Sequence, residues 1–273
     1  MRIWLDGALR EGDGARVSVF DHGLTVGDGV FETLKAEHGQ VFALTRHLER
    51  LTRSARGLGL PDPDPEEVRE ACTAVLAANP MPLGRLRITY TGGVSPLGSD
   101  RGQEGTTLVV AVGETTRRPD STAVITVPWV RNERSAIAGL KSTSYAENVV
   151  ALAEAHRAAA SEALFANTVG RLCEGTGSNV FVVLDGELHT PPVTSGCLAG
   201  ITRALVVEWA GAKETELPFD VLEQAEEVFL TSTLRDVQAV RRIDGRTLAD
   251  APGPVTAEAM RIFDERSAAD IDP

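Results

Sequence analysis

The sequence predicts an α+β fold in which hairpins and helices are interleaved. Two observations support this prediction. The first forty residues contain two hairpin patterns, and the later strands and helices do not follow the strand–helix–strand rhythm of a doubly wound parallel sheet. The chain has 273 residues, enough for one large α/β unit or two modest domains at roughly 100–200 residues each. With 42% hydrophobic and 24% charged residues, the composition is that of an ordinary globular protein and excludes a disordered chain.

The N-terminal half contains the hairpin patterns and two helical patterns. Residues 3–9 and 15–20 are short alternating runs around a Gly-rich turn, which predicts a first hairpin, and residues 30–44 predict a second one that turns at Gly39. Thr45 can cap a helix, because apolar residues recur at helical spacing after it. A further helix near 66–78 and strands at 85–91 and 107–112 complete this half.

The C-terminal half is predicted to contain more strands and longer helices. Asp185-Gly186, a favoured two-residue turn, predicts a hairpin over 179–190, and Gly211 closes a helix over 200–211. The other elements expected here are strands at 123–129 and 227–233 and helices at 145–160 and 256–266. A polar segment between strand-like runs is the best linker candidate. We therefore expect a smaller N-terminal α/β domain at 1–114, an interdomain linker at 115–122 and a larger C-terminal domain at 123–273.

Net charge, cysteine usage and the N-terminus exclude several classes of partner. Acidic residues outnumber basic ones 39 to 27, for a formal net charge of −12, whereas nucleic acids and anionic membranes favour a basic surface. The N-terminus has no apolar signal-peptide core, and no apolar run approaches the ~20 residues of a membrane span. The three cysteines and five histidines lack the spacing of a disulfide framework or a metal site. We expect a cytoplasmic protein with no metal, no nucleic-acid partner and no membrane partner.

One lysine has surroundings that suit chemistry. Only three of the 27 basic residues are lysine, and Lys141 lies in GLKSTSY among small, uncharged neighbours. An arginine stays protonated, whereas a lysine in such surroundings can act as a nucleophile or a base. The ordinary alternative is a surface lysine without a chemical role. The motifs of other enzyme classes are missing, since GTGSNV at 175–180 leads into a strand and the chain has no P-loop or nucleophile elbow.

Two clusters of small and hydroxyl residues predict an anion site. Gly200, Ile201 and Thr202 begin a predicted helix, where the first-turn N–H groups are free to bind an anion. The sequence TST at 231–233 ends a predicted strand and can donate further hydrogen bonds to the same anion. An ordinary loop and an ordinary turn are the alternatives.

An arginine and a carboxylate complete this set of groups. Arg50 lies between apolar positions of the first helix and can reach a phosphate with its bidentate guanidinium. Glu174 precedes a turn of small residues and can accept a hydrogen bond from a ring nitrogen. Each alone also fits a solvated helix face or a cap. A lysine, an anion cradle, an arginine and a carboxylate are together the groups that hold pyridoxal phosphate.

Several segments carry a resemblance to a known family. Residues 174–181 (EGTGSNVF), 188–190 (LHT) and 198–203 (LAGITR) are similar, with fixed gaps, to the long pattern of the class IV pyridoxal-phosphate aminotransferases. Within that family the chain resembles the aminodeoxychorismate lyases of high-GC bacteria. Further matching segments are 21–33 (DHGLTVGDGVFET), 47–55 (HLERLTRSA), 139–148 (GLKSTSYAEN) and 229–233 (FLTST).

The resemblance implies fold type IV of the pyridoxal-phosphate enzymes, with a barrel-like sheet in the larger domain and the cofactor in the cleft between the domains. By position, Lys141 matches the Schiff-base lysine, Glu174 matches the acid that hydrogen-bonds the pyridine nitrogen, and Tyr145 falls near the residue that contacts the phenolic oxygen. The residues implied at the phosphate are Arg50, Gly200, Ile201, Thr202, Ser232 and Thr233. The resemblance also implies a homodimer that acts on a small-molecule amino substrate.

The resemblance implies two reactions, and a third hypothesis stands beside them. Thr33 matches a Thr that assists catalysis in the lyases, which favours 4-amino-4-deoxychorismate lyase, an enzyme of folate biosynthesis that forms 4-aminobenzoate and pyruvate. The alternative is an aminotransferase for branched-chain amino acids, D-amino acids or related amines. The third hypothesis is a non-catalytic binding module that keeps the fold. Phe31, Tyr90 and Arg87 are expected to contact the substrate, and Arg101 is a second candidate for its carboxylate.

Overall fold

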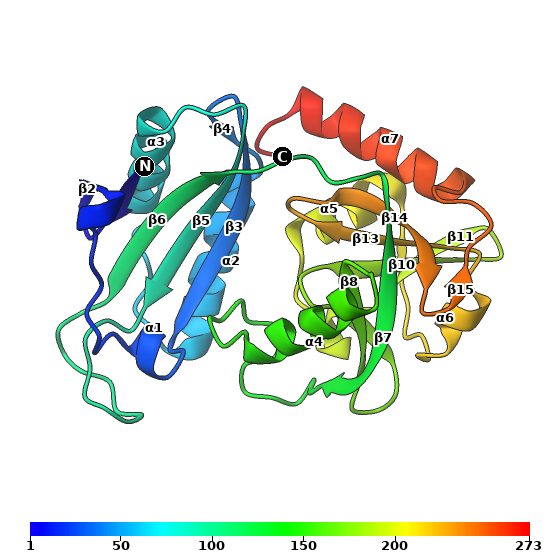
Figure 1. The fold of residues 1–273 in the computed structure, drawn as a ribbon, viewed down its shortest axis with the longest axis horizontal. Helices are drawn as coiled ribbons and strands as arrows, with labels where there is room; N and C mark the ends of the chain where they lie inside the picture. Colours follow the sequence, from blue (N-terminus) through cyan, green and yellow to red (C-terminus); the bar gives the residue numbers. More distant parts are fainter. The chain divides into compact units, whose positions relative to one another are not determined.

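The computed structural model describes all 273 residues, which divide into two compact units (Figure 1). Unit 1 comprises Met1–Thr116, Leu140–Tyr145 and Ile271–Pro273, and unit 2 comprises Arg117–Gly139 and Ala146–Asp270. Two segments of the sequence's second half thus belong to the first unit. The amide of Phe31 donates to the carbonyl of Lys141 (2.9 Å), and the amide of Ala43 donates to the carbonyl of Ile271 (2.7 Å). These backbone hydrogen bonds explain why the units are not two continuous stretches of chain.

Unit 1 contains an antiparallel sheet of six strands in the order β2-β1-β6-β5-β3-β4. The strands are β1 (Arg2–Leu5), β2 (Ala8–Glu11), β3 (Gly29–Glu37), β4 (Gln40–Val41), β5 (Leu83–Thr91) and β6 (Thr107–Glu114). The first hairpin turns at Asp6 and Gly7, which both have the positive φ of a tight two-residue turn. The prediction of a strand at 15–20 was wrong, because this earlier turn already closes the hairpin and leaves those residues outside the sheet.

Two helices, α2 (Leu44–Leu58) and α3 (Pro65–Ala78), pack on one face of this sheet, and α1 (His22–Thr25) is a single turn before β3 (Figure 1). Leu51 of α2 and Val75 of α3 share a hydrophobic core with Leu86 of β5. Thr45 does not cap α2. The helix begins at Leu44, and the Thr45 hydroxyl donates instead to a carboxylate oxygen of Asp272 (2.6 Å).

The pleat of β3 and β5 sends neighbouring side chains to opposite faces of the sheet. Leu34 and Tyr90 lie in the core on the helix side. Phe31 and Thr33 lie on the other face, where Thr33 pairs with Arg87 of β5. Tyr90 was expected to contact the substrate, but strand alternation places it on the core face, away from Phe31 and Arg87. We therefore leave it out of the candidate site.

Unit 2 contains a mixed sheet of nine strands in the order β12-β11-β10-β13-β14-β7-β8-β9, with β15 paired to β14. The strands are β7 (Ser121–Arg131), β8 (Glu162–Asn167), β9 (Leu172–Gly175), β10 (Asn179–Leu184), β11 (Glu187–Thr190), β12 (Lys213–Glu214), β13 (Glu227–Ser232), β14 (Asp236–Ile243) and β15 (Arg246–Thr247). Leu172 of β9 and Val180 of β10 belong to the same core as Val124 and Val240 of the central strands. The sheet therefore curves around one hydrophobic core.

The helices of unit 2 are α4 (Ala146–Arg157), α5 (Ile201–Ala210), α6 (Val221–Gln224) and α7 (Pro254–Ala269). Helix α4 packs against β7 and β8 through small side chains such as Ala151 and Ala155. Helices α5 and α7 pack together, with the rings of Trp209 and Phe263 5.5 Å apart. Gly211 ends α5 in the left-handed conformation, as its sequence predicts. None of the helices combines the length and the apolar character needed to cross a membrane.

Candidate active site

The backbone around Lys141 is fixed by two elements of unit 1. The amide of Lys141 donates to the hydroxyl of Ser54 on α2 (3.2 Å), and its carbonyl accepts from the amide of Phe31 on β3 (2.9 Å). Two residues further along, the amide of Thr143 donates to the carbonyl of Gly29 (2.8 Å). The lysine segment thus lies along β3 as a short extended piece of chain.

The side chain of Lys141 meets two aromatic rings. Its Nζ lies 4.4 Å from the ring centroid of Phe31 and 5.8 Å from that of Tyr145. The two rings contact each other edge to face, with centroids 5.0 Å apart. The structure therefore brings together three residues that the sequence analysis selected separately. Aromatic walls restrict water around the amine and give a flat ligand a surface on which to pack.

Arg87 lies against the same ring and has no acidic partner. Its guanidinium carbon is 3.5 Å from the Phe31 ring centroid, and its one hydrogen bond runs from Nε to the hydroxyl of Thr89 (3.2 Å). No carboxylate lies within ion-pair distance of it. Burial lowers the pKa of Arg87. A half-buried arginine without a counter-ion is a ready partner for an anionic ligand, because its charge is already partly removed from water.

On the opposite face of β3, Glu32 forms a buried charged cluster with two residues of α2. Its carboxylate accepts from Arg50 through Nε (2.8 Å) and Nη2 (2.7 Å), and it lies 2.7 Å from Nδ1 of His47. Burial opposes ionisation of Glu32, yet Arg50 and His47 outweigh it and hold the pKa of this carboxyl at about 2. Burial also lowers the pKa of His47. Arg50 was expected as a site residue, whereas Glu32 and His47 were not, because nothing in the sequence shows that these two side chains meet.

In unit 2, Glu174 is the second-to-last residue of β9, and both of its carboxylate oxygens accept hydrogen bonds. Its Oε2 accepts from the amide of Leu198 (2.9 Å), and its Oε1 accepts from Nε of Arg131 (3.1 Å). Arg131 also donates to Glu147 (2.6 Å) and stacks on Phe165, with its guanidinium carbon 4.1 Å from the ring centroid. Arg131 and Leu198 both belong to unit 2, so contacts within this unit fix the orientation of the Glu174 carboxylate. Nothing in the sequence around Arg131 marks it as a partner of Glu174.

The turn that follows Glu174 is supported by a second buried acid. Glu162 of β8 accepts from the amide and hydroxyl of Thr176 and from the hydroxyl of Ser178 (2.8 Å). Arg235 lies 3.5 Å from the same carboxylate and offsets its charge. Glu162 was not expected as a site residue, although a carboxylate at the start of the apolar run EALFAN is a signal, because a buried acid needs donors.

The expected phosphate residues of unit 2 gather around the start of α5. Gly200 precedes this ten-residue helix and provides no side-chain cap, so the first-turn amides of Ile201 and Thr202 have no acceptor within the helix. Asn179 links the residues just before α5 to β13. Its Nδ2 donates to the carbonyl of Leu198 (2.8 Å), and its backbone pairs with Thr231 of β13. Ser232 and Thr233 follow directly at the end of β13.

Two details show that these residues fit a phosphate-bearing cofactor. A Cβ at Gly200 would lie 2.0 Å from Oδ1 of Asn179, so only glycine allows the close approach seen here. The hydroxyl of Thr231 is buried and has no hydrogen-bond partner. Uncapped amides and a spare hydroxyl are the donor set that an anion at a helix N-terminus uses.

These features belong to a defined class of enzyme. The model of the amino-transferase class IV family matches residues 29–243, and the chain belongs to that family. A protein of Methanocaldococcus jannaschii, provisionally named branched-chain-amino-acid aminotransferase, is 36% identical over 96% of this chain and 95% of its own length. The D-alanine aminotransferase of Staphylococcus haemolyticus is 31% identical over 97% of each chain.

Solved structures of the same family share the fold. The branched-chain aminotransferase of Thermoproteus uzoniensis superposes with a TM-score of 0.91 at 30% identity and covers 97% of this chain and 94% of its own. A structure from Legionella pneumophila, provisionally named 4-amino-4-deoxychorismate lyase, has a TM-score of 0.87 at 25% identity, over 93% and 96% of the two chains. The α+β class and fold type IV expected from the sequence are thereby confirmed.

The family depends on pyridoxal phosphate, and an aminotransferase structure from Mycobacterium tuberculosis in its cofactor-bound form is similar to this chain, with a TM-score of 0.85 at 27% identity over 97% and 98% of the two chains. The chain is therefore a pyridoxal-phosphate enzyme, either a transaminase or a lyase. This result sets aside the hypothesis of a non-catalytic binding module.

The cluster of Glu32, His47 and Arg50 predicts a loss of stability in acid. A histidine with a lowered pKa in the folded protein resists protonation, whereas the unfolded chain takes up the proton below about pH 6.5. The free energy of unfolding should therefore fall from pH 7 to pH 5, by at most about 1.4 kcal/mol per pH unit from His47. Glu32 adds a further loss below about pH 4.5, where the unfolded carboxyl protonates. Urea titrations at each pH measure both.

The matched variants are His47→Gln and His156→Gln. His47→Gln should flatten the dependence between pH 7 and 5, and His156→Gln, at an exposed position of α4, should leave it unchanged. An unaltered slope in His47→Gln would contradict the assignment of the acid sensitivity to this cluster.

Gly200→Ala should weaken cofactor binding while the protein still folds. The new methyl group would collide with Asn179 and push apart the turn that presents the amides of Ile201 and Thr202. We expect affinity for pyridoxal phosphate to fall about tenfold or more, which corresponds to 1.4 kcal/mol. Cofactor titration followed by absorbance measures this. Gly245→Ala is the control, since a Cβ there meets nothing within 4 Å. Equal affinity in both variants would remove Gly200 from the phosphate site.

Proposed function

We propose that this protein is a pyridoxal-phosphate aminotransferase for branched-chain or D-amino acids. The observation that carries the proposal is the cluster of Lys141, Phe31 and Arg87 on one face of β3 and β5. In this cluster the amine of Lys141 and the guanidinium of Arg87 both lie against the ring of Phe31, and Arg87 has no acidic partner. The named relatives, which are branched-chain and D-alanine aminotransferases, support this reading over the lyase.

We propose the following roles for residues of the two units. Lys141 would hold pyridoxal phosphate covalently, Tyr145 would contact its phenolic oxygen, and Glu174 would accept a hydrogen bond from its ring nitrogen. The first-turn amides of α5 and hydroxyl groups at the end of β13 would bind the phosphate, and Arg50, whose Nε and Nη2 donate to Glu32, would add its positive charge to this site. The proposed phosphate residues of unit 2 are Gly200, Ile201, Thr202, Ser232 and Thr233.

Lys141 and Glu174 have different roles in the proposed reaction. When bound, pyridoxal phosphate supplies an electron-withdrawing ring that stabilises the charge left at the substrate's α-carbon. Once the substrate amine has displaced it from the cofactor, the free ε-amine of Lys141 would remove the α-proton as a general base and then, as a general acid, would deliver it to the cofactor carbon that Lys141 had held. Glu174, fixed by Leu198 and Arg131, stays in place to hold the ring nitrogen protonated. Arginine at position 141 would not perform this proton transfer, because it keeps its charge.

We propose that Arg87 binds a carboxylate of the amino acid or 2-oxo acid substrate. It is half-buried, it touches Phe31, and no acid of the protein neutralises it. Arg101, the other candidate, is already bound to Asp28 through two hydrogen bonds of 2.7 Å. An arginine with free donors is better suited to a ligand carboxylate than one whose donors are engaged.

A lyase is the second candidate function, and Thr33 favours it. Its side chain lies on the same face as Phe31 and directly opposite Arg87 in the sheet register, so it can act on a substrate held there. The Legionella pneumophila structure with the provisional lyase name is a relative of that kind. Loss of pyruvate from aminodeoxychorismate would then replace amino-group exchange.

We also propose that the enzyme is a homodimer. An apolar segment before β3 is unusually exposed, with Val19 and Leu24 both 69% accessible and Phe20 49% accessible. Leu97 on the β5–β6 loop is 75% accessible, and the amide of Ser95 in this loop donates to the carbonyl of Phe20 (3.1 Å). Exposed apolar groups clustered in this way favour burial against a second subunit.

The experiment that tests the proposed function compares two reactions in one purified enzyme. We expect amino-group transfer from branched-chain or D-amino acids to 2-oxo acids, and no 4-aminobenzoate from aminodeoxychorismate. Lys141→Ala should lose this transfer and the adduct trapped by borohydride, because no other group replaces the amine. Formation of pyruvate and 4-aminobenzoate without a 2-oxo acid would favour the lyase, and an adduct that survives Lys141→Ala would overturn the role of Lys141.

Arg87→Gln should weaken binding of the acidic substrate. Removing a charged hydrogen-bond donor costs about 1.5–3 kcal/mol, so KM for the 2-oxo acid should rise about tenfold or more. The control is Arg85→Gln, an exposed arginine two residues earlier on the same face of β5. Steady-state kinetics with varied 2-oxo acid measure both variants. Equal KM values for Arg87→Gln, Arg85→Gln and the wild type would rule out Arg87 as the carboxylate partner.

A further inference from the structure

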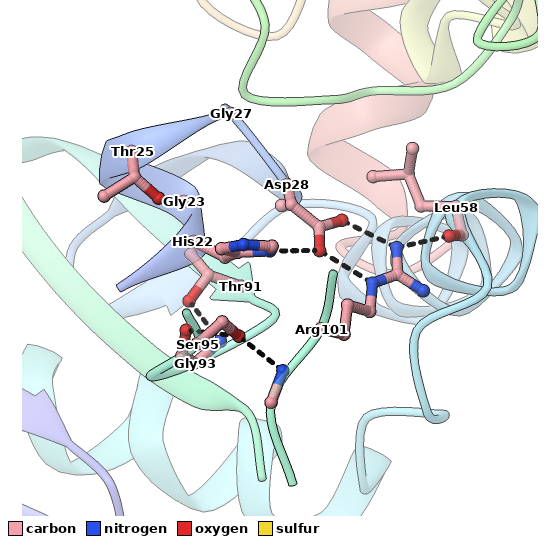
Figure 2. A network of polar contacts seen from close by, with 12 residues as sticks. His22, Gly23, Thr25, Gly27, Asp28, Leu58, Thr91, Gly93, Ser95 and Arg101 are labelled. Carbon is pink, nitrogen blue, oxygen red and sulfur yellow. Dashed lines mark hydrogen bonds and ion pairs between the residues drawn. The ribbon is translucent and has the colours of Figure 1, made fainter. Parts of the chain in front are cut away.

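The long loop at residues 92–106, between β5 and β6, is fastened to two other elements by Arg101 (Figure 2). Nε and Nη2 donate to the two carboxylate oxygens of Asp28, each at 2.7 Å. Nη1 donates to the carbonyl of Gly59 (2.7 Å), and Nη2 also donates to the carbonyl of Leu58 (2.6 Å). We call this set of four contacts the Arg101 clamp.

One end of the clamp lies at the start of β3. Asp28 immediately precedes this strand, and its backbone carbonyl accepts from the amide of Gly92 (2.9 Å). Nδ1 of the buried His22 lies 3.3 Å from the carboxylate on the other side (Figure 2). The hydrogen bond from Arg101 holds the pKa of Asp28 below its usual value. The acid is therefore ionised at neutral pH and binds the guanidinium in the bidentate manner that gives the strongest pairs.

The other end of the clamp lies at the end of α2. The last carbonyls of a helix have no partner within it, and Leu58 and Gly59 are the last helical residue and the C-cap of α2. A cation at this end also interacts favourably with the helix dipole. One side chain, distant in sequence from both ends, thus joins the start of β3 to the end of α2.

These two elements are the ones that fix the backbone of Lys141. Ser54 of α2 accepts from the amide of Lys141, and Phe31 of β3 donates to its carbonyl. The hydroxyl of Thr143 also donates to the carbonyl of Gly27 (2.9 Å), next to Asp28. A shift of α2 against β3 would therefore break or lengthen hydrogen bonds on both sides of the lysine.

We propose that Arg101 is a positioning residue: it holds the end of α2 against the start of β3 and thereby fixes the backbone of Lys141. This inference rests on the proposed function, since it assigns Arg101 a role through the cofactor-binding lysine. It also gives different roles to the two arginines that were candidates for the substrate carboxylate. Arg101 fixes the backbone around Lys141, and Arg87 binds the carboxylate of the substrate.

Hydrogen exchange on the full-length protein tests the clamp without using the cofactor. In Arg101→Gln and Asp28→Asn, the amides of Lys141, Phe31 and Thr143 should exchange about tenfold faster or more than in the wild type, a factor that corresponds to 1.4 kcal/mol of local opening. The matched control is Arg56→Gln, which removes an exposed bidentate pair with Asp62 in the same unit and should change none of the three. Unchanged exchange in both clamp variants would overturn the inference.

The holoenzyme supplies a second readout that a purely structural role would not move. In Arg101→Gln, the pH midpoint of the absorbance change of the bound cofactor should shift and kcat should fall, while KM for the 2-oxo acid stays within about twofold of the wild type. Arg101→Lys should recover only part of the change, because an ammonium does not span a carboxylate and two carbonyls in one plane. A raised KM with unchanged exchange would assign Arg101 to the substrate and overturn the inference. A wild-type protein without a borohydride-trapped adduct would refute the proposed function instead.

Discussion

The period-two alternation of β3 is the constraint on which the site of unit 1 depends. Phe31 and Glu32 are neighbours in the chain, yet the pleat sends them to opposite faces. Phe31 faces Lys141 and Arg87, whereas Glu32 enters the buried cluster with Arg50 and His47. A register shift of one residue would exchange these roles and bury an aromatic ring where an ion pair now lies.

Charged side chains of the two units differ in whether a group of opposite charge lies beside them. Buried acids have donors close by, as Glu32 has Arg50 and Glu162 has the turn at Thr176 and Ser178. Such pairing is expected, because a buried charge without a partner is costly. Arg87 is half-buried without an acid, as Arg69, Arg171 and Arg242 also are, but of these four only Arg87 lies against the ring of Phe31, which Lys141 also contacts. The proposed substrate contact thus rests on the place of Arg87 beside Phe31 and Lys141 together with its lack of an acidic partner.

Much of the local structure was predictable from the sequence. The turn at Asp185-Gly186 and the glycine end of α5 depend on a few adjacent residues, and both are confirmed. Strand β8 (EALFAN) was missed because it is buried on both faces and shows no alternation. The short hairpin at Asp6-Gly7 was misjudged because a longer Gly-rich turn competed with it in the sequence. Likewise, Arg131 lies 43 residues from Glu174 and Arg101 lies 73 residues from Asp28, so no local pattern joins either pair.

We propose that Lys141 is the residue that carries the cofactor. The chain has only two other lysines, Lys35 and Lys213, so few other residues could form this bond. To locate the bond, the holoenzyme is reduced with borohydride and digested, and the added mass of the cofactor is assigned by peptide mass spectrometry. We expect this mass on the peptide that contains Lys141. Its presence on the peptide of Lys35 or Lys213, or on none, would refute the assignment.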